Sequence, residues 1–592
     1  MNELKDFIIE DGVLVKYTGE GGDVEIPNSV TSIGACAFRD CRNLTSVTLP
    51  DSITSIGDFA FYQCEKMASI EIPNSVEGIG EYAFHSCQSL TSIVIPSSTI
   101  SIGRNAFTWC TSLASVTLGN NVESIGEEAF YFCRSLTSII IPNSTISIGA
   151  SAFEGCESLT SITLGDSVAS IGRAPFLYCE SLTNIKVDEK NEYYKSIDGN
   201  LYTKDGEVLI QYAVGKTDAA FTVIAGVKYI ADCAFRECSS LTSITLGDSL
   251  ESIGNGAFCE CTSLTSIIIP NSTFSIGEDA FAGCDSLTNI TLGDSVECIG
   301  DYAFAHCKSL TSITFGEWVE YMGEGAFCGC TALTSIILGN YVQNISALAF
   351  NNCKSLTSIT FGNSTISIGE EAFAGCESLT NITGVYVESI GDGAFKGCNS
   401  LTNITLGVYV ESIGDGAFKD CKSLTSITIG NFVKSIADDA FVGCENLTIN
   451  GYAGGEAEAH AMEKEIPFKE ILKDEISERK GFIIEIGVLV RYDGDGGDVV
   501  IPNSVESIGA GAFAGCETLT SITLGNSVTS IYNLAFLDCS SLTSITLSDS
   551  VKSIAENAFD GCYELTIKGY AGSYAETYAK ENRIPFEEIK EE

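Results

Sequence analysis

The sequence is rich in cysteine, a residue suited to disulfide, metal or nucleophilic chemistry, and most of its cysteines recur at one interval. Of its 25 cysteines, twenty stand in register, each three residues after a phenylalanine. These twenty, here called the ladder cysteines, are Cys41, Cys64, Cys87, Cys110, Cys133, Cys156, Cys179, Cys238, Cys261, Cys284, Cys307, Cys330, Cys353, Cys376, Cys398, Cys421, Cys444, Cys516, Cys539 and Cys562. Their usual spacing is 23 residues. A fixed interval of this kind indicates a structural repeat rather than a reactive centre.

The geometry of stacked repeats argues against disulfides and metal ligation. Equivalent side chains on parallel strands lie about 4.8 Å apart, whereas a relaxed disulfide needs Cβ atoms about 3.8 Å apart. The cysteines outside the register are Cys36, Cys233, Cys259, Cys298 and Cys328. The close pairs Cys259/Cys261 and Cys328/Cys330 lack a second pair or a histidine at a zinc-type spacing. We therefore expect free thiols, no bound metal and no cofactor, in a reducing or anaerobic setting.

Histidine, the usual general base, is scarce in this chain. The three histidines are His85, His306 and His460. His85 and His306 occupy variable positions close to ladder cysteines, and His460 lies in a predicted cap helix. His306 is adjacent in sequence to Cys307, but adjacent side chains generally point apart, and the same cysteine recurs without histidine in other repeats. The sequence therefore predicts a protein that is not an enzyme.

Size and charge narrow the fold class and the class of partner. A chain of 592 residues exceeds the size at which one closed core stops growing, so it forms several domains or an elongated array. The formal net charge of −46 opposes binding to nucleic acid and to anionic membranes. The first residues, MNELKDFIIEDG, include acids and no apolar signal region, and no long apolar segment follows. We expect a cytoplasmic protein with no nucleic-acid partner and no membrane insertion.

The repeated unit itself predicts a β-rich solenoid. It reads L-T-S-I-T-L-(G/P)-x-S-V-x-S-I-G-x-x-A-F-x-x-C-x-S, and a strict period of 23 residues is typical of stacked coils. The L-x-x-I-x-L spacing of Leu287, Ile290 and Leu292 predicts a short strand, because it is too short for a helix and rich in β-branched residues. Stacked repeats then form a parallel sheet, and the Val, Ile, Ala, Phe and Cys positions of the return path fill the interior. One repeat cannot bury that face alone, so each coil depends on its neighbours.

Two passages that occur twice predict two capped arrays in tandem. Residues 7–34 recur as 482–509 and are expected to form β-hairpin caps, and residues 447–468 recur as 565–586 and are expected to form helical caps. The first predicted array spans 1–474, with an N-cap at 1–26, seventeen repeats, a β-hairpin insertion at about 187–221 and a C-cap at 450–474. The second spans 475–592, with an N-cap at 479–500, three repeats and a C-cap at 568–592. The insertion contains a strand–Lys-Asp-Gly–strand signal, and its tail at 198–235 loosely parallels the first cap.

The A-F-x-x-C and P-F-x-x-C units, the I-P-N-S-V-x-S-I-G turns and the G-Y-A-G…I-P-F endings resemble the BspA-type leucine-rich repeat, also seen in the treponemal class of such repeats. The resemblance covers nearly the whole chain. It implies a curved, right-handed leucine-rich-repeat superhelix used for binding. Some members of the family are surface adhesins for host or bacterial proteins, whereas others lack an export signal, and we expect this chain to resemble the latter.

The resemblance also implies which side chains face outwards from the sheet. They are the residues that flank the central apolar residue of each strand, and here they form pairs such as Ser312/Thr314, interrupted by Glu71 and Lys186. Ser and Thr pair well across strands and keep a sheet soluble, so a structural role accounts for them. The alternative is a functional role, in which these hydroxyl groups form hydrogen bonds to an extended partner.

A second surface feature is a change of residue type just before the valine of the S-V-x-S-I-G turn. Most repeats place serine there, for example Ser75. Six consecutive repeats instead carry Trp318, Tyr341, Ser364, Tyr386, Tyr409 and Phe432. At about 4.8 Å per coil these residues form a line roughly 25 Å long. We call Trp318, Tyr341, Tyr386, Tyr409 and Phe432 the aromatic column and predict that it binds a partner, because exposed aromatic surface commonly marks a contact site. Packing of the rings against each other after local duplication is the alternative.

These observations together predict a non-enzymatic binding protein that recognises a protein partner, or alternatively a glycan, along a solenoid. Two other functions stay open. The first is an adhesin located at the cell surface or secreted, and the second is an architectural element that spaces or assembles other components. The sequence does not define an oligomeric state.

Overall fold

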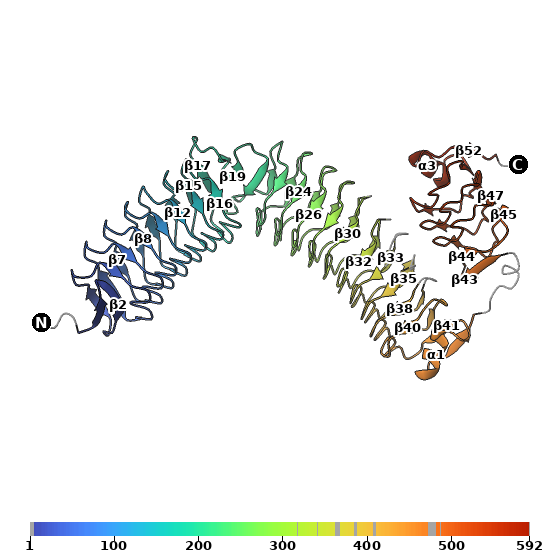
Figure 1. Cartoon of the computed structure of the whole chain (residues 1–592), viewed down its shortest axis with the longest axis horizontal. Coiled ribbons are helices and arrows are strands. Elements are labelled where there is room, and N and C mark those ends of the chain that lie inside the picture. Colours follow the sequence, from blue (N-terminus) through green and yellow to red (C-terminus); the bar gives the residue numbers. More distant parts are fainter. Residues whose placement is uncertain are drawn as a thin grey trace. The chain divides into compact units, whose positions relative to one another are not determined.

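The computed structural model is a β-solenoid in which most coils contribute two short strands (Figure 1). It describes residues 5–316, 318–339, 341–361, 367–383, 387–406, 410–471, 481–485 and 487–590. In a representative coil, β9 (Ser92–Val94) is the strand predicted from the L-x-x-I-x-L spacing, and β10 (Ser101–Ile102) is a second strand. The sequence predicted a return path without a strand at the second position, and that prediction was wrong. Two residues are too few to show the alternation by which strands are recognised.

Strands at the predicted position stack in parallel along one side of the coils. Hydrogen bonding divides them into several sheets, which are here together called the first sheet. They are β3 (Gly22–Glu25), β5 (Leu44–Thr48), β7 (Ser69–Glu71), β9, β11 (Ser115–Thr117), β13 (Ser138–Ile140), β15 (Ser161–Leu164), β17 (Asn184–Val187), β21 (Ala220–Thr222), β23 (Ser243–Thr245), β25 (Ser266–Ile268), β27 (Asn289–Thr291), β29 (Ser312–Thr314), β31 (Ser335–Ile337), β33 (Ser358–Thr360), β35 (Asn381–Thr383), β37 (Asn403–Thr405), β39 (Ser426–Thr428), β41 (Thr448–Gly451), β45 (Gly497–Val500), β47 (Leu519–Thr523), β49 (Ser544–Thr546) and β51 (Thr566–Gly569). Equivalent residues pair 23 positions apart, as Ser92 does with Ser115.

The two-residue strands stack in the same way and form the second sheet. They are β4 (Ser32–Ile33), β6 (Ser55–Ile56), β8 (Gly78–Ile79), β10, β12 (Ser124–Ile125), β14 (Ser147–Ile148), β16 (Ser170–Ile171), β22 (Tyr229–Ile230), β24 (Ser252–Ile253), β26 (Ser275–Ile276), β28 (Cys298–Ile299), β30 (Tyr321–Met322), β32 (Asn344–Ile345), β34 (Ser367–Ile368), β36 (Ser389–Ile390), β38 (Ser412–Ile413), β40 (Ser435–Ile436), β46 (Ser507–Ile508), β48 (Ser530–Ile531) and β50 (Ser553–Ile554). Ser101 pairs with Ser124 in parallel. The second residue of each pair, which is isoleucine except for Met322, points into the interior.

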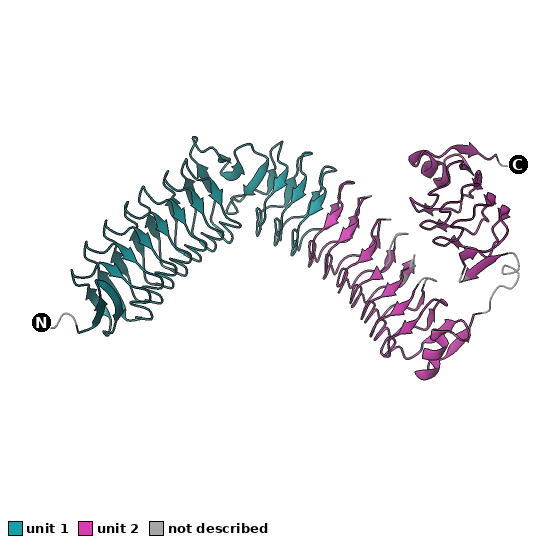
Figure 2. Ribbon diagram, in the orientation of Figure 1, with its two compact units in different colours: residues 1–287 teal, residues 288–592 magenta. Residues whose placement is uncertain are grey.

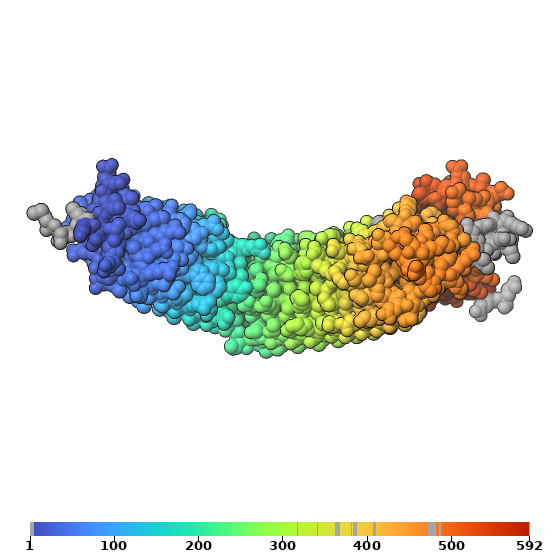
Figure 3. All heavy atoms as spheres, turned by 90° about the horizontal axis from the view of Figure 1, so that it is seen from below, coloured from blue at the N-terminus to red at the C-terminus, as the bar shows by residue number. Residues whose placement is uncertain are grey.

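The interior between the two sheets is a stack of phenylalanine rings and cysteine thiols. The rings of Phe84 and Phe107 lie 5.1 Å apart at an angle of 3°, and Phe107 stacks in the same way on Phe130. All 25 cysteines are free thiols, as predicted. Most ladder cysteines are buried, whereas Cys41, Cys444, Cys516 and Cys562, at the ends of the arrays, are partly exposed. Side chains fill the gaps between ribbons, so neighbouring coils present a continuous surface (Figure 3).

The predicted caps are present at the ends of both arrays. β1 (Phe7–Glu10) and β2 (Val13–Tyr17) form an antiparallel hairpin, as do β43 (Phe482–Glu485) and β44 (Val488–Tyr492). Tyr17 and Tyr492 lie 5.0 Å from the first phenylalanine of their stacks. The C-terminal caps are the helices α1 (Glu456–Glu463) and α3 (Tyr574–Glu581), followed by strands β42 (Phe468–Glu470) and β52 (Phe586–Glu588). A hairpin or a helix therefore covers each open end of a stack, which would otherwise expose apolar rings.

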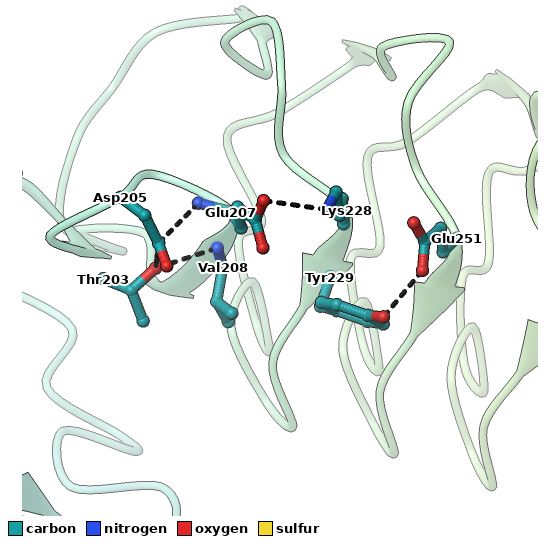
Figure 4. Close-up of polar contacts among 7 residues, drawn as sticks. All are labelled: Thr203, Asp205, Glu207, Val208, Lys228, Tyr229 and Glu251. Atoms are coloured by element: carbon teal, nitrogen blue, oxygen red, sulfur yellow. Dashed lines mark hydrogen bonds and ion pairs between the residues drawn. The ribbon is translucent and has the colours of Figure 1, made fainter.

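The predicted insertion is also a β-hairpin. β18 (Tyr194–Ile197), β19 (Asn200–Thr203) and β20 (Val208–Gln211) pair antiparallel, and the Lys-Asp-Gly turn at 204–206 joins the last two. Asp205 holds this turn, because its carboxylate accepts bonds of 2.6 Å from the Thr203 hydroxyl and 2.9 Å from the Glu207 amide (Figure 4). Tyr212 then stacks on Phe235 at 5.1 Å, as Tyr17 does on its own stack. The insertion thus starts a new stack of rings, as the N-cap does.

The chain divides into two compact units, residues 1–287 and 288–592 (Figure 2). The predicted boundary between the two arrays, at 474/475, lies outside the described residues. The two-array division therefore stays a prediction. The apolar side chains of 482–579 form a cluster of their own. In the described parts of the chain, no helix is long and apolar enough to cross a bilayer.

Candidate interaction surface

The aromatic column belongs to the turn between the two strands of a coil. In several coils the residue at this position is a serine whose hydroxyl donates to a main-chain carbonyl of the preceding coil. Ser75 Oγ lies 2.6 Å from the Ile53 oxygen, and Ser144 Oγ lies 2.8 Å from the Val122 oxygen. Ser75 and Ser144 are half-buried, whereas Ser167 and Ser295, at the same position of other coils, are exposed as predicted. The hydroxyl links one coil to the next.

Aromatic residues at this position cannot make that bond, and two of them lie well out in solvent. Trp318 is 46% exposed and Phe432 is 43% exposed. Tyr341 is half-buried, and its ring stacks on Trp318 with centroids 4.9 Å apart at 22°. The Tyr341 hydroxyl also donates to the carboxylate of Glu556. The structure thus brings Trp318 and Tyr341 together across neighbouring coils.

The other positions of the column are not brought together by any described contact. Tyr386, Tyr409 and the intervening Ser364 lie outside the described residues. Phe432 is described, but no ring contact of Phe432 with the rest of the column is observed in the described residues. Binding by the five residues as one continuous column therefore stays a prediction.

Acidic and aromatic side chains surround Trp318. Val319 is buried, so Trp318 and Glu320 on either side of it both point outwards, as alternate residues of extended chain do. Tyr321, the next residue, is 50% exposed. Its pKa is raised, first by partial burial and then by the nearby carboxylate of Asp301. The surface around Trp318 is therefore aromatic and negatively charged.

The sheet face offers a second surface, and its composition differs from the prediction. Ser312 and Thr314 are exposed on either side of Ile313, as expected. However, Ile140, Ile268 and Ile337 are each 71% exposed at the threonine position of this face. The sequence predicted a face of hydroxyl groups interrupted by charged residues. The exposed isoleucines were not predicted. The signal was the S-I-I triplet that replaces S-I-T in three repeats.

The ladder thiols are poorly suited to nucleophilic chemistry. Burial raises the pKa of the Cys376 thiol to about 12, so it stays protonated and unreactive at neutral pH. His85 stacks on Tyr62 at 4.8 Å, and burial lowers its pKa. His460 lies in α1, as predicted, and packs edge-on against Phe441 at 5.6 Å. Among the described residues, no group of three or more His, Cys, Asp or Glu side chains is arranged to hold a metal ion.

The repeats match a known family over most of the chain. The model of the BspA type leucine rich repeat region matches six copies, over residues 16–116, 100–201, 219–334, 320–448 and 495–571. The chain belongs to this family. The family and the parallel solenoid were both predicted from the A-F-x-x-C units and the 23-residue period, and both are confirmed. No curated protein sequence matches this BspA-type leucine-rich repeat chain.

Several solved bacterial structures are similar to it. A leucine rich cell surface protein of Faecalibacterium prausnitzii A2-165 is 27% identical, covers 64% of this chain and 92% of its own, and has a TM-score of 0.38. A leucine-rich repeat protein of Bacteroides ovatus is 26% identical, covers 79% of this chain and all of its own, with a TM-score of 0.36. The leucine-rich repeat protein of T. pallidum is 26% identical over 36% of this chain and 89% of its own, with a TM-score of 0.27.

Proposed function

We propose that this leucine-rich repeat protein binds a protein partner through the aromatic column, centred on Trp318 and Tyr341. The observation that carries the proposal is the pair of stacked rings, 4.9 Å apart, at a position where other coils place a hydrogen-bonded serine. The column gives up that bond between coils and exposes apolar surface instead. Apolar surface left exposed does not stabilise a fold, which favours a role in contact.

The physical properties of the surface suit a protein partner. Tryptophan and tyrosine are the residues most often found to dominate binding energy at protein interfaces. Here they stand on coils fixed by neighbours on both sides, so little conformational freedom is lost on binding. A glycan is the alternative ligand, and the sheet face with its serine, threonine and exposed isoleucine side chains is the alternative surface.

The test is capture of partners from the source cells with the full chain and with Trp318→Ser/Tyr341→Ser. Serine is the residue that other coils place at this position, so the substitution fits the fold. The matched control is Trp109→Ser, which removes the other tryptophan, 36% exposed, from a different face of a coil. We expect the partner to be lost from the first variant and kept by the control. Full retention of the partner by the double variant would remove the column from consideration.

The location of the protein in the cell determines which partners it can meet. The cytoplasmic location expected from the sequence receives no support from the comparisons, and the F. prausnitzii relative is described as a cell surface protein. We propose the surface location as the one to test. Protease treatment of intact cells should digest a surface protein and spare a cytoplasmic one.

Self-assembly is the remaining alternative. A chain with a formal net charge of −46 repels its own copies at long range, which disfavours a homotypic scaffold. Light scattering of the purified chain tests this, and ordered self-association without a ligand would favour an architectural role.

A further inference from the structure

One column of the second sheet shows how this fold holds a cationic side chain. The column consists of the residue immediately before each two-residue strand, together with Glu207, which precedes β20 in the same sheet. At the restart after the insertion it reads Glu207, Lys228, Glu251, and Lys228 Nζ lies 2.7 Å from Glu207 Oε1 (Figure 4). Tyr229 follows Lys228, and its hydroxyl donates to Glu251 at 2.6 Å. Glu207 thus pairs with the ammonium group of Lys228, and Glu251 on the next coil pairs with Tyr229.

The lysine–glutamate pair occurs again further along the chain. Lys434 Nζ lies 2.7 Å from Glu411 Oε2, one coil away in the same column. The Glu207 carboxylate also raises the pKa of Lys228, as expected when the charged form is favoured. At both places, a lysine of the chain itself occupies the site.

In the coils next to Trp318, the position before the second-sheet strand carries glutamates and no lysine. Glu297 and Glu320 occupy the equivalent position on successive coils, and the main-chain amide of Glu320 donates to the main-chain carbonyl of Glu297 at 3.0 Å. Both are exposed, and within the described residues neither has an ion-pair partner. Two like charges one coil apart repel each other, so this is an unfavourable arrangement in the isolated chain. A cation placed between them would relieve that repulsion.

The exposed rings beside these glutamates favour the same kind of ligand. Trp318 is 46% exposed and Tyr321 is 50% exposed. Trp318 stands two residues before Glu320, and Tyr321 directly follows it. The faces of aromatic rings attract lysine and arginine side chains, tryptophan most strongly. Carboxylates and ring faces together therefore select a cationic group and disfavour an anionic one.

We infer that the surface formed by Glu297, Trp318, Glu320 and Tyr321 receives a lysine or arginine side chain from a basic, extended segment of the partner. The bound side chain pairs with these carboxylates as Lys228 pairs with Glu207 on the neighbouring coil. This inference rests on the proposed function and names the chemistry of the partner. It also assigns Glu297 and Glu320, which stand outside the predicted aromatic column, to the binding surface.

The probe is a fluorescently labelled octalysine peptide, whose binding to the full chain is followed by anisotropy at about 150 mM salt, where exposed charges are strongly screened. The test variant is Glu297→Gln/Glu320→Gln. Its matched control is Glu77→Gln/Glu123→Gln, which removes the same charge from the same position of coils without the aromatic column. An octaglutamate peptide serves as the anionic control and should not bind.

We expect the test variant to bind octalysine roughly tenfold more weakly, the control pair less than about twofold more weakly, and Trp318→Ser about three- to fivefold more weakly. Equal weakening by the two glutamine pairs would mean that only overall charge matters and would overturn the inference. Unchanged binding by the test variant, or no binding of octalysine at all, would overturn it too.

The two proposals fail in different ways. If the captured partner depends on Trp318 but binds the Glu297→Gln/Glu320→Gln chain normally, protein binding stands and the cationic segment is wrong. If the captured partner is unaffected by Trp318→Ser/Tyr341→Ser, the proposed function is wrong, whatever the result with octalysine.

Discussion

The thiol of Cys110 donates a hydrogen bond of 3.1 Å to the main-chain carbonyl of Phe84, on the preceding coil. Cys330 makes the same bond to Phe304, also at 3.1 Å. The position therefore requires a small apolar side chain that can also donate one weak hydrogen bond, and cysteine has both properties. This explains the regular cysteines without any redox or metal chemistry.

Removing one of these thiols should destabilise the array. We expect Cys110→Ala to lower the free energy of unfolding by about 1 kcal/mol, because a buried sulfur and its hydrogen bond are lost. Cys298→Ala, at an exposed cysteine, should change it by less than about 0.5 kcal/mol. Urea denaturation followed by circular dichroism measures both. Equal effects at the two sites would contradict the structural role of the ladder.

High pH should unfold the protein. Burial raises the pKa of the Cys330 and Cys376 thiols to about 12, whereas an unfolded cysteine titrates near about 8.5. Above that value the unfolded chain releases protons that the folded chain keeps, so stability is full below about pH 8.5 and falls as pH rises towards 12. Each such thiol contributes up to about 1.4 kcal/mol per pH unit over that range.

Thermal unfolding between pH 7 and 11 provides the measurement, with Cys330→Ala/Cys376→Ala as the comparison. The variant should be less stable at pH 7 but should lose less stability than the wild type between pH 9 and 11. A parallel decline of the two proteins would show that these thiols do not govern the alkaline transition.

Close stacking of the coils should make one class of glycine irreplaceable. A Cβ atom at Gly126 would lie 2.6 Å from the main-chain nitrogen of Arg104 on the preceding coil. We expect Gly126→Ala to destabilise the protein by about 2 kcal/mol or more, because backbone must move to make room. Gly247→Ala is the control, since its nearest atom would be 4.0 Å away. Chemical denaturation distinguishes them, and a tolerated Gly126→Ala would contradict the stacking described here.

Loss of binding at the aromatic column should not come with loss of stability. In Trp318→Ser, the new hydroxyl can make the bond to the preceding coil that Ser75 makes to Ile53 at 2.6 Å. The lost stacking of Trp318 on Tyr341 offsets this gain, so we expect the unfolding free energy to change by less than about 1 kcal/mol. Conversely, Ser75→Ala should lower it by about 1 kcal/mol. A Trp318→Ser chain that melts well below the wild type would show that the ring is needed for folding.

The sequence predicted most of the fold because the fold is periodic. The 23-residue interval, the L-x-x-I-x-L strand and the duplicated passages led to the solenoid, its sheet and its caps. The second strand was missed because Ser-Ile pairs such as Ser101–Ile102 are too short to show a pattern. The hydrogen bond of Cys110 was missed for a different reason, since sequence alone does not show which carbonyl of the preceding coil lies within reach.

The candidate site was less predictable than the fold. The aromatic residues stood out because they interrupt a serine column, but the half-buried, hydrogen-bonded state of Ser75 depends on the turn geometry. Glu297 and Glu320 drew no attention because glutamate is common in this acidic chain. Their significance came from Lys228, which the structure places beside Glu207 in an equivalent position.

The most direct test of the account is hydrogen–deuterium exchange of the full chain with and without its captured partner. We expect slower exchange on binding in the coils at 294–301 and 318–324, which carry Glu297, Trp318, Glu320 and Tyr321, and no change in the equivalent turns at 75–81. Protection confined to the first-sheet strands, such as β13, β25 and β31 with their exposed isoleucines, would contradict it.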